Sequence, residues 1–190
     1  ARALRWIRDH GSQYPCDMRN IMLTGDSAGG QLAAYSAVLM QSAQLRKTFD
    51  TVDPQMELTA LLLTSPVAFM RDGGLFSLYT KPMWGTDYKD KATYPYMDFD
   101  QIIDYAQALP PTYLITSSGD TLANKQTHRL YEVLQAHGVQ AEIKDYAKAE
   151  YNQSLPHVFS VLQPFEPAGT AAIDLSLIHI SEPTRHSLIS

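Results

Sequence analysis

Residues 25–30, which read Gly-Asp-Ser-Ala-Gly-Gly, constrain the fold more than any other stretch of the chain. An apolar run at residues 20–24 precedes them, and a run of helix-forming residues at 31–40 follows. The order predicts a strand, a sharp turn and a helix, with Ser27 at the turn. A turn of this kind holds its central serine in a strained backbone conformation and raises the hydroxyl above the sheet.

The presence of glycine on both sides of Ser27 has a steric explanation. Because the turn is so tight, the positions two before and two after the serine need residues with almost no side chain, and Gly25 and Gly29 meet that need. The Ala28 N–H and the positive end of the following helix would face an oxyanion formed beside the serine. The predicted elbow around the nucleophile Ser27 is thus made of Gly25, Asp26, Gly29 and Gly30, with Ala28 as an oxyanion-hole donor.

Two other readings of the stretch fit poorly. A phosphate-binding Walker loop needs a Gly-Lys-Ser/Thr ending, and a dinucleotide fingerprint needs Gly-x-Gly-x-x-Gly; neither is present. Gly-x-Ser-x-Gly between a strand and a helix is instead the nucleophile elbow of α/β-hydrolases. The hexapeptide resembles that of the hormone-sensitive-lipase-like carboxylesterases, and so does the preceding segment with Trp6, Ile7, Asp9 and His10.

The rest of the chain alternates between helical and strand patterns. Residues 1–11 predict an amphipathic helix, residues 56–65, 112–117 and 141–146 predict strands, and residues 121–137 predict a helix. Strands that alternate with helices at this spacing form a right-handed, mostly parallel sheet. The fold class is therefore α/β, and the resemblance implies an α/β-hydrolase fold, a mostly parallel sheet flanked by helices.

Residues 67–109 interrupt this rhythm with a long connection. We interpret it as a cap-like insertion that lines the acyl or alcohol pocket, with ordinary packing as the alternative for about half of its aromatic residues. They include Phe69, Phe76, Tyr79, Trp84, Tyr88, Tyr94, Tyr96 and Phe99.

A serine nucleophile needs a histidine base and a carboxylate that holds the imidazole, and α/β-hydrolases carry them in the order serine, acid, histidine. Asp120 directly follows the third predicted strand, although it is also well placed to cap the next helix. Its surroundings resemble the family's Asp-Pro-Leu motif, with Thr121 in place of the proline. Asp145 and Glu150 remain alternative acids.

Of the six histidines, His157 lies in a loop after the last predicted strand and in a segment that resembles the family's catalytic-histidine segment. A surface loop histidine is the alternative. His128 and His137 fall within and at the end of a predicted helix, positions typical of solvated histidines. The predicted catalytic residues are therefore Ser27, Asp120 and His157.

The resemblance spans residues 6–172, the C-terminal half or so of the family's domain, so we expect the N-terminal strands to be missing. No His-Gly-Gly-Gly oxyanion motif occurs in the chain. We expect a partial domain at residues 1–174 that is inactive by itself. Residues 175–190 begin with a segment that resembles a translated sequencing adapter, and we predict that they are a non-native tail.

The composition limits the classes of partner that we expect for this chain. The net charge is −5, without charge runs, which gives no nucleic-acid signature, and no apolar run is long enough for a transmembrane segment. The single cysteine, Cys16, allows no internal disulfide and no zinc cluster, and we assign it a structural role. Oligomeric state stays open, and so does the compartment, with the cytoplasm slightly favoured.

These features predict a serine hydrolase that acts on short- to medium-chain carboxylic esters, small-molecule substrates, with no cofactor and no metal. The alternatives are a serine peptidase or amidase on the same fold, and a non-catalytic ligand-binding homologue.

Overall fold

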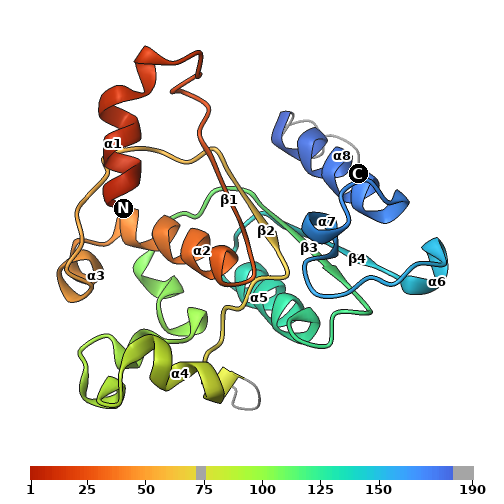
Figure 1. Cartoon of the computed structure of the whole chain (residues 1–190). Helices are drawn as coiled ribbons and strands as arrows, with labels where there is room; N and C mark the ends of the chain where they lie inside the picture. Colours follow the sequence, from red (N-terminus) through yellow and green to blue (C-terminus); the bar gives the residue numbers. More distant parts are fainter. Residues whose placement is uncertain (72–75, 182–190) are drawn as a thin grey trace.

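Four parallel strands form the central sheet, in the same order as they occur in the chain (Figure 1). They are β1 (Met22–Asp26), β2 (Ala60–Thr64), β3 (Thr112–Ser117) and β4 (Ala141–Tyr146). The computed structural model describes residues 1–71 and 76–181. The predicted α/β class with a parallel sheet is confirmed.

Two strands have boundaries that differ from the sequence prediction. The first strand begins at Met22 and extends to Asp26, and the second begins at Ala60, four residues later than predicted. The two starts are linked, because Met22 and Ala60 are the first paired residues of this ladder. The Thr59 N–H still donates to the Ile21 carbonyl at 2.8 Å, but the ladder itself begins with the next residue of each segment.

The segments that connect the strands pack on one face of the sheet. This face carries α2 (Ala28–Gln41), followed by α3 (Ala43–Thr48), and α5 (Asn124–Ala136). Right-handed crossovers in a sheet that grows in one direction place every connection on the same side. The main core lies between these helices and the sheet and includes Val38, Leu45, Leu61, Leu63, Leu114 and Leu130.

The opposite face is covered by the chain that follows β4 (Figure 1). After α6 (Lys148–Tyr151), this segment forms α7 (Phe159–Leu162) and α8 (Pro167–Ser181). Phe159 stacks near Tyr146 of β4, with ring centroids 5.2 Å apart, in a second core that also contains Ile115 of β3. The chain after the last strand thus covers this face over β3 and β4.

Helix α8 continues through residue 174 into residues 175–181 without a break. The helix therefore marks no boundary where the adapter-like segment begins, and the division at residue 174 stays a prediction. Residues 182–190 lie outside the described part of the chain.

The predicted insertion forms α4 (Phe76–Trp84) and four short 3₁₀ helices, η2 (Tyr88–Asp90), η3 (Tyr94–Tyr96), η4 (Phe99–Gln101) and η5 (Ile103–Tyr105). Most of its aromatic rings serve packing. Phe69 and Phe99 are fully buried in the main core, while Trp84, Tyr88 and Tyr94 pack around a small cluster of Val67, Met70, Met97 and Ala123. The side chains of Phe76 and Tyr79 lie outside the described residues.

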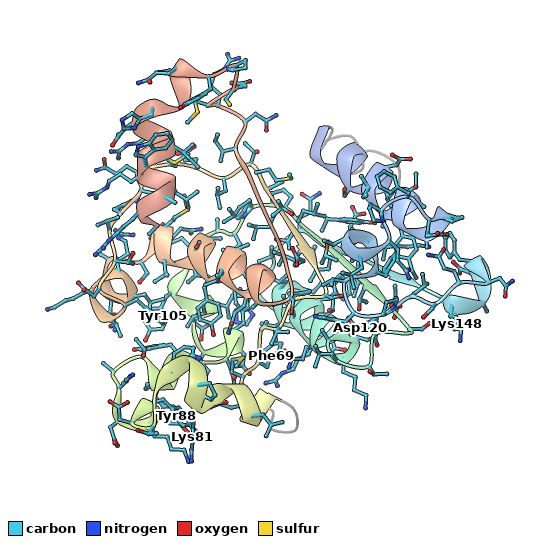
Figure 2. All side chains as sticks on the ribbon, viewed as in Figure 1. Phe69, Lys81, Tyr88, Tyr105, Asp120 and Lys148 are labelled. Carbon is cyan, nitrogen blue, oxygen red and sulfur yellow. The ribbon has the colours of Figure 1, made fainter. Side chains whose placement is uncertain are left out.

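A buried glutamine ties α5 to this insertion. The Gln126 side-chain amide donates to the Phe69 carbonyl and accepts from the Phe69 N–H, both at 3.1 Å. Figure 2 labels Phe69, and the Arg129 guanidinium of α5 lies 3.9 Å from the centre of its ring. A single side chain therefore satisfies both backbone groups of a buried loop residue, as buried polar groups require.

The N-terminal helix α1 (Arg2–His10), followed by η1 (Gly11–Gln13), confirms the predicted amphipathic helix. Arg5 donates to the Asp53 carbonyl and Arg8 to the Pro54 carbonyl. Cys16 is exposed, so the structural role assigned to it is wrong. Among the described residues, no helix combines the length and the apolar character needed to cross a membrane.

Candidate active site

The turn between β1 and α2 has the predicted strained geometry. Ser27 has φ 52° and ψ −117°, a region that residues with side chains rarely adopt, and α2 begins at the next residue. Its backbone is tied to the end of β2, because the Ser27 N–H donates to the Thr64 carbonyl (2.9 Å) and the Val67 N–H donates to the Ser27 carbonyl (3.1 Å). Hydrogen bonds to both backbone groups of Ser27 therefore stabilise its strained conformation.

The steric prediction for the glycines is right at Gly25 and wrong at Gly29. A Cβ on Gly25 would lie 2.2 Å from the Gly29 carbonyl oxygen, whereas a Cβ on Gly29 would meet no atom within 4 Å. The second tight position is Gly30, whose Cβ would lie 2.9 Å from the Pro66 Cβ. The reason is that the helix turns Gly30, and not Gly29, towards the segment after β2.

Asp120 follows β3 and does not cap the next helix, because α5 begins at Asn124 and its N-cap is Ala123, without a side-chain cap. The Asp120 Oδ1 instead accepts the N–H groups of Leu122 and Ala123, in the turn before the helix, at 3.0 and 2.8 Å. Its Oδ2 lies 2.9 Å from the Nδ1 of His157. The carboxyl group is fully buried, and Figure 2 labels its position.

The electrostatics of Asp120 favour the ionised form. Burial by itself raises the pKa of the carboxyl, but hydrogen bonds from His157 and the Ala123 N–H, together with the Ser65 hydroxyl, outweigh it and lower the pKa below its ordinary value. An ionised carboxylate accepts a hydrogen bond from the Nδ1–H of His157 and so selects the tautomer in which Nε2 carries no proton.

His157 completes the arrangement, because its Nε2 lies 2.8 Å from the Ser27 Oγ. The loop that carries it is held against the loop of Asp120. The Ser117 hydroxyl donates to the Leu155 carbonyl at 2.7 Å, and a Cβ on Gly119 would lie 2.4 Å from the same oxygen. The imidazole remains partly exposed, with 23% of its side-chain surface accessible, so a substrate has access to it.

The alternative acids lie elsewhere. Asp145 contacts the Nε2 of His128 at 2.8 Å and the Asn124 amide at 2.9 Å, and Glu150 is exposed on α6. His128 was expected to be a solvated histidine, but it pairs with this carboxylate. Asp120 is the carboxylate that the structure brings to His157.

The first turn of α2 offers backbone donors beside Ser27. The N–H groups of the first helical residues, among them Ala28, have no intrahelical acceptor, and the helix dipole places partial positive charge there. Asp26 is exposed on the side of the turn before Ser27. Within residues 1–71 and 76–181, no cluster of three or more histidine, cysteine or acidic side chains is suited to hold a metal ion.

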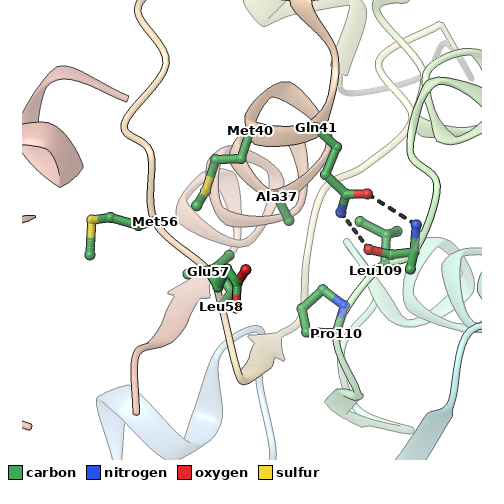
Figure 3. A pocket seen from close by; sticks show the side chains of 9 residues that line it. Ala37, Met40, Gln41, Met56, Glu57, Leu58, Leu109 and Pro110 are labelled. Carbon is green, nitrogen blue, oxygen red and sulfur yellow. Dashed lines mark hydrogen bonds between the residues drawn. The ribbon is translucent and has the colours of Figure 1, made fainter. Parts of the chain in front are cut away.

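A cavity of about 500 Å³ lies at the other end of α2, lined by Met40, Gln41, Met56 and Pro110 among others (Figure 3). The Gln41 amide closes one side of it through hydrogen bonds with residues 107 and 108. A 14-residue helix is about 20 Å long, so this cavity is remote from Ser27 and is not the site of its chemistry.

A family model for the α/β hydrolase fold matches residues 1–155. The chain belongs to this family. The resemblance to the hormone-sensitive-lipase-like carboxylesterases is thereby supported by a match over most of the sequence, and the α/β-hydrolase fold is confirmed.

Known relatives agree with this membership. The probable carboxylic ester hydrolase LipM of Mycobacterium tuberculosis is 25% identical over 174 residues, which cover 90% of this chain and 39% of LipM. The crystal structure of esterase B from Lactobacillus Rhamnosis superposes with a TM-score of 0.85 and 27% identity, over 97% of this chain and 59% of that one. Its complex with a C4-C4 tributyrin phosphonate gives a TM-score of 0.86 and 28% identity.

A thermophilic esterase, Est2 of Thermogutta terrifontis, shares the fold with a TM-score of 0.66 and 22% identity. The present α/β-hydrolase chain covers only part of the relatives named above. It spans about three fifths of the length of esterase B and about two fifths of the length of LipM.

The sequence analysis missed two residues that support the site, Ser65 and Leu155. Ser65 directly follows β2, at the edge of the sheet where Ser27 and Asp120 also lie. Its position after a buried strand and before Pro66 is the signal that could have drawn attention to it. The Leu155 contribution is a backbone carbonyl, which no sequence pattern reveals.

Proposed function

We propose that this chain carries the catalytic residues of a serine carboxylesterase, with Ser27 as nucleophile, His157 as general base and Asp120 as the carboxylate that orients the base. One observation carries the proposal: the continuous path from Ser27 Oγ to His157 Nε2 (2.8 Å) and from His157 Nδ1 to Asp120 Oδ2 (2.9 Å). A serine hydroxyl is a weak nucleophile at neutral pH, and this arrangement activates it.

In the first step, His157 Nε2 takes the hydroxyl proton while Ser27 Oγ attacks the ester carbonyl. The oxyanion of the tetrahedral intermediate lies beside the Ala28 N–H and the positive end of α2, which stabilise it. His157 then gives its proton to the leaving alcohol, and an acyl-enzyme remains on Ser27. Water, deprotonated by His157, hydrolyses this ester and restores the hydroxyl. Asp120 stays ionised throughout and stabilises the imidazolium.

For the substrate, we propose short- to medium-chain carboxylic esters. The support comes from relatives. LipM bears the name of a probable carboxylic ester hydrolase, and esterase B has been solved with a C4-C4 tributyrin phosphonate and in a form described as C6-C4 inhibited. We further propose that residues 67–109 serve as the cap of the ester site, since they pack beside α2 and α5 immediately after the strand next to Ser27.

The test combines covalent labelling with ester hydrolysis. Because residues 1–174 are expected to be inactive by themselves, the assays use the chain extended by the N-terminal strands of the fold. A fluorophosphonate probe should label this extended chain at Ser27, and the extended chain should hydrolyse aryl esters of two to eight carbons. Ser27→Ala should abolish labelling, and both Ser27→Ala and His157→Ala should lower turnover by several orders of magnitude. Ser36→Ala, on the same helix, is the matched control and should behave like the wild type.

Three results would contradict the proposal or redirect it. Labelling that survives Ser27→Ala would show that the nucleophile is another residue. Faster cleavage of aryl amides than of the matching esters would favour an amidase. Ester binding without labelling or turnover would favour a ligand-binding protein.

A further inference from the structure

The segment that follows β2 lies between the nucleophile and the strand that leads to the acid. Thr64 and Val67 bind the two backbone groups of Ser27, as described above, and the Ser65 N–H donates to the Ile115 carbonyl of β3 at 2.7 Å. Ser65 is therefore fixed by its backbone at the junction of the two strands whose ends carry Ser27 and Asp120.

The conformation of Ser65 is unfavourable in two respects. Its φ is 46°, in the left-handed region where glycine is preferred, and it precedes a proline. Its side chain is completely buried, and its hydroxyl has no completed hydrogen bond among the described residues. A buried hydroxyl without a partner costs free energy, and so does the backbone strain. Neither alanine nor glycine at this position would bury an unpartnered hydroxyl.

The Ser65 hydroxyl and the Asp120 carboxyl are both fully buried, and they follow the neighbouring paired strands β2 and β3. The same hydroxyl contributes to the lowered pKa of the Asp120 carboxyl. An ionised carboxylate has about four lone-pair positions for hydrogen bonds. Two N–H groups of the following turn and the His157 ring occupy three of them, which leaves one position for a further donor. A serine hydroxyl, which rotates freely, suits that position.

We propose that Ser65 is a positioning residue, which donates its hydroxyl to the Asp120 carboxylate and holds the oxygen that faces His157 in place. The inference rests on the proposed function, because the purpose of the contact is to orient the base. The competing explanation is structural: the junction after β2 needs a small residue, and serine merely fits.

Two substitutions separate these explanations. Ser65→Ala removes the hydroxyl and keeps the Cβ, and Ser65→Gly also relieves the strained φ, so this variant should fold at least as well as the wild type at this position. Thr116→Val is the matched control, because Thr116 is another fully buried residue of the same sheet whose hydroxyl has no partner among the described residues.

The first measurement is a ¹³C NMR titration of the Asp120 carboxyl in the 190-residue chain, with Asp120→Asn used to assign its signal. We expect the pKa of Asp120 to be higher in Ser65→Ala and in Ser65→Gly than in the wild type, and unchanged in Thr116→Val. A structural role would not move this titration. Unchanged Asp120 titration in both Ser65 variants would overturn the proposal.

The second measurement is ester hydrolysis by the chain extended with the N-terminal strands of the fold, since residues 1–174 are expected to be inactive alone. Both Ser65 variants should lower kcat about tenfold with little change in KM, since a factor of ten corresponds to about 1.4 kcal/mol, the order of one net hydrogen bond. A Ser65→Gly variant with the kcat of the wild type would also overturn the proposed role of Ser65. If no variant or wild type hydrolyses esters while the titration still shifts, the proposed function fails and the Ser65–Asp120 contact stands.

Discussion

The two glycines of the Gly-x-Ser-x-Gly motif should respond very differently to the same substitution. Gly25→Ala places a Cβ 2.2 Å from the Gly29 carbonyl oxygen, 2.3 Å from its carbonyl carbon and 2.7 Å from the Gly30 nitrogen. All three atoms belong to the backbone of the first turn of α2, so no side chain can rotate away. Gly29→Ala adds the same methyl group to open space.

The magnitude for Gly25→Ala follows from these contacts. Ordinary contact with a Cβ requires about 3.4 Å or more, so β1 and the start of α2 must separate by roughly 1 Å. Overpacking costs about 1–3 kcal/mol, and rigid backbone on both sides places this case at or above about 3 kcal/mol. For a chain of this length that corresponds to a fall in Tm of about 6–12 °C. A displacement of about 1 Å at the nucleophile also lowers turnover about 100-fold.

Gly29→Ala should leave Tm unchanged or raise it by a few degrees. Gly29 lies within α2 and has no positive φ, and alanine is favoured over glycine in a helix by about 0.5–1 kcal/mol. The assay is thermal unfolding of the 190-residue chain, followed by circular dichroism, with fluorophosphonate labelling as the readout of the elbow. Equal losses of Tm in the two variants would refute the steric argument, and so would a Gly25→Ala variant with the Tm and labelling rate of the wild type.

Three further predictions concern stability and pH. Gln126→Leu should lower the free energy of unfolding, measured by urea titration, by about 2–4 kcal/mol, because it leaves two buried backbone groups of Phe69 without partners. The control is Gln135→Leu at an exposed position of the same helix, which should change this free energy by less than about 0.5 kcal/mol. Since the folded-state pKa of Asp120 is lowered, its carboxylate stabilises the fold above the unfolded pKa of about 3.9, and this contribution disappears as the pH falls through the folded value. The stability difference between wild type and Asp120→Asn should therefore shrink below about pH 4, and a constant difference from pH 7 to 3 would contradict this. Finally, kcat/KM for aryl esters should decrease in acid, because general-base catalysis needs a neutral imidazole, whereas a flat profile would argue against imidazole catalysis.

The local elements of this protein were predictable because their signals are local. The order of strand, glycine-rich turn and helix around Ser27 is written in consecutive residues, and so is the alternation that produces a parallel sheet. The order of serine, acid and histidine along the chain identified Asp120 and His157 as the candidates that the structure places beside Ser27. Chain order was informative here because parallel strands bring their carboxyl ends to one edge of the sheet.

Tertiary structure decided what depends on contacts between distant residues. The sequence treats Gly25 and Gly29 as equivalent, and only the packing of α2 against β1 and Pro66 shows that the tight positions are Gly25 and Gly30. The second strand begins at Ala60 because its partner begins at Met22, which residues 56–59 do not encode.

Tertiary contacts also decided which carboxylate pairs with His157. Asp145 lies in β4 and Asp120 follows β3, and the sequence favoured Asp120 without excluding Asp145. The structure gives Asp145 two other partners, His128 and Asn124 of α5, and brings Asp120 to His157, where we propose that Ser65 supports it. The sequence alone determined which residue types were available for the chemistry. Their pairing came from three-dimensional packing, because hydrogen bonds between side chains form only where the fold brings the atoms within about 3 Å.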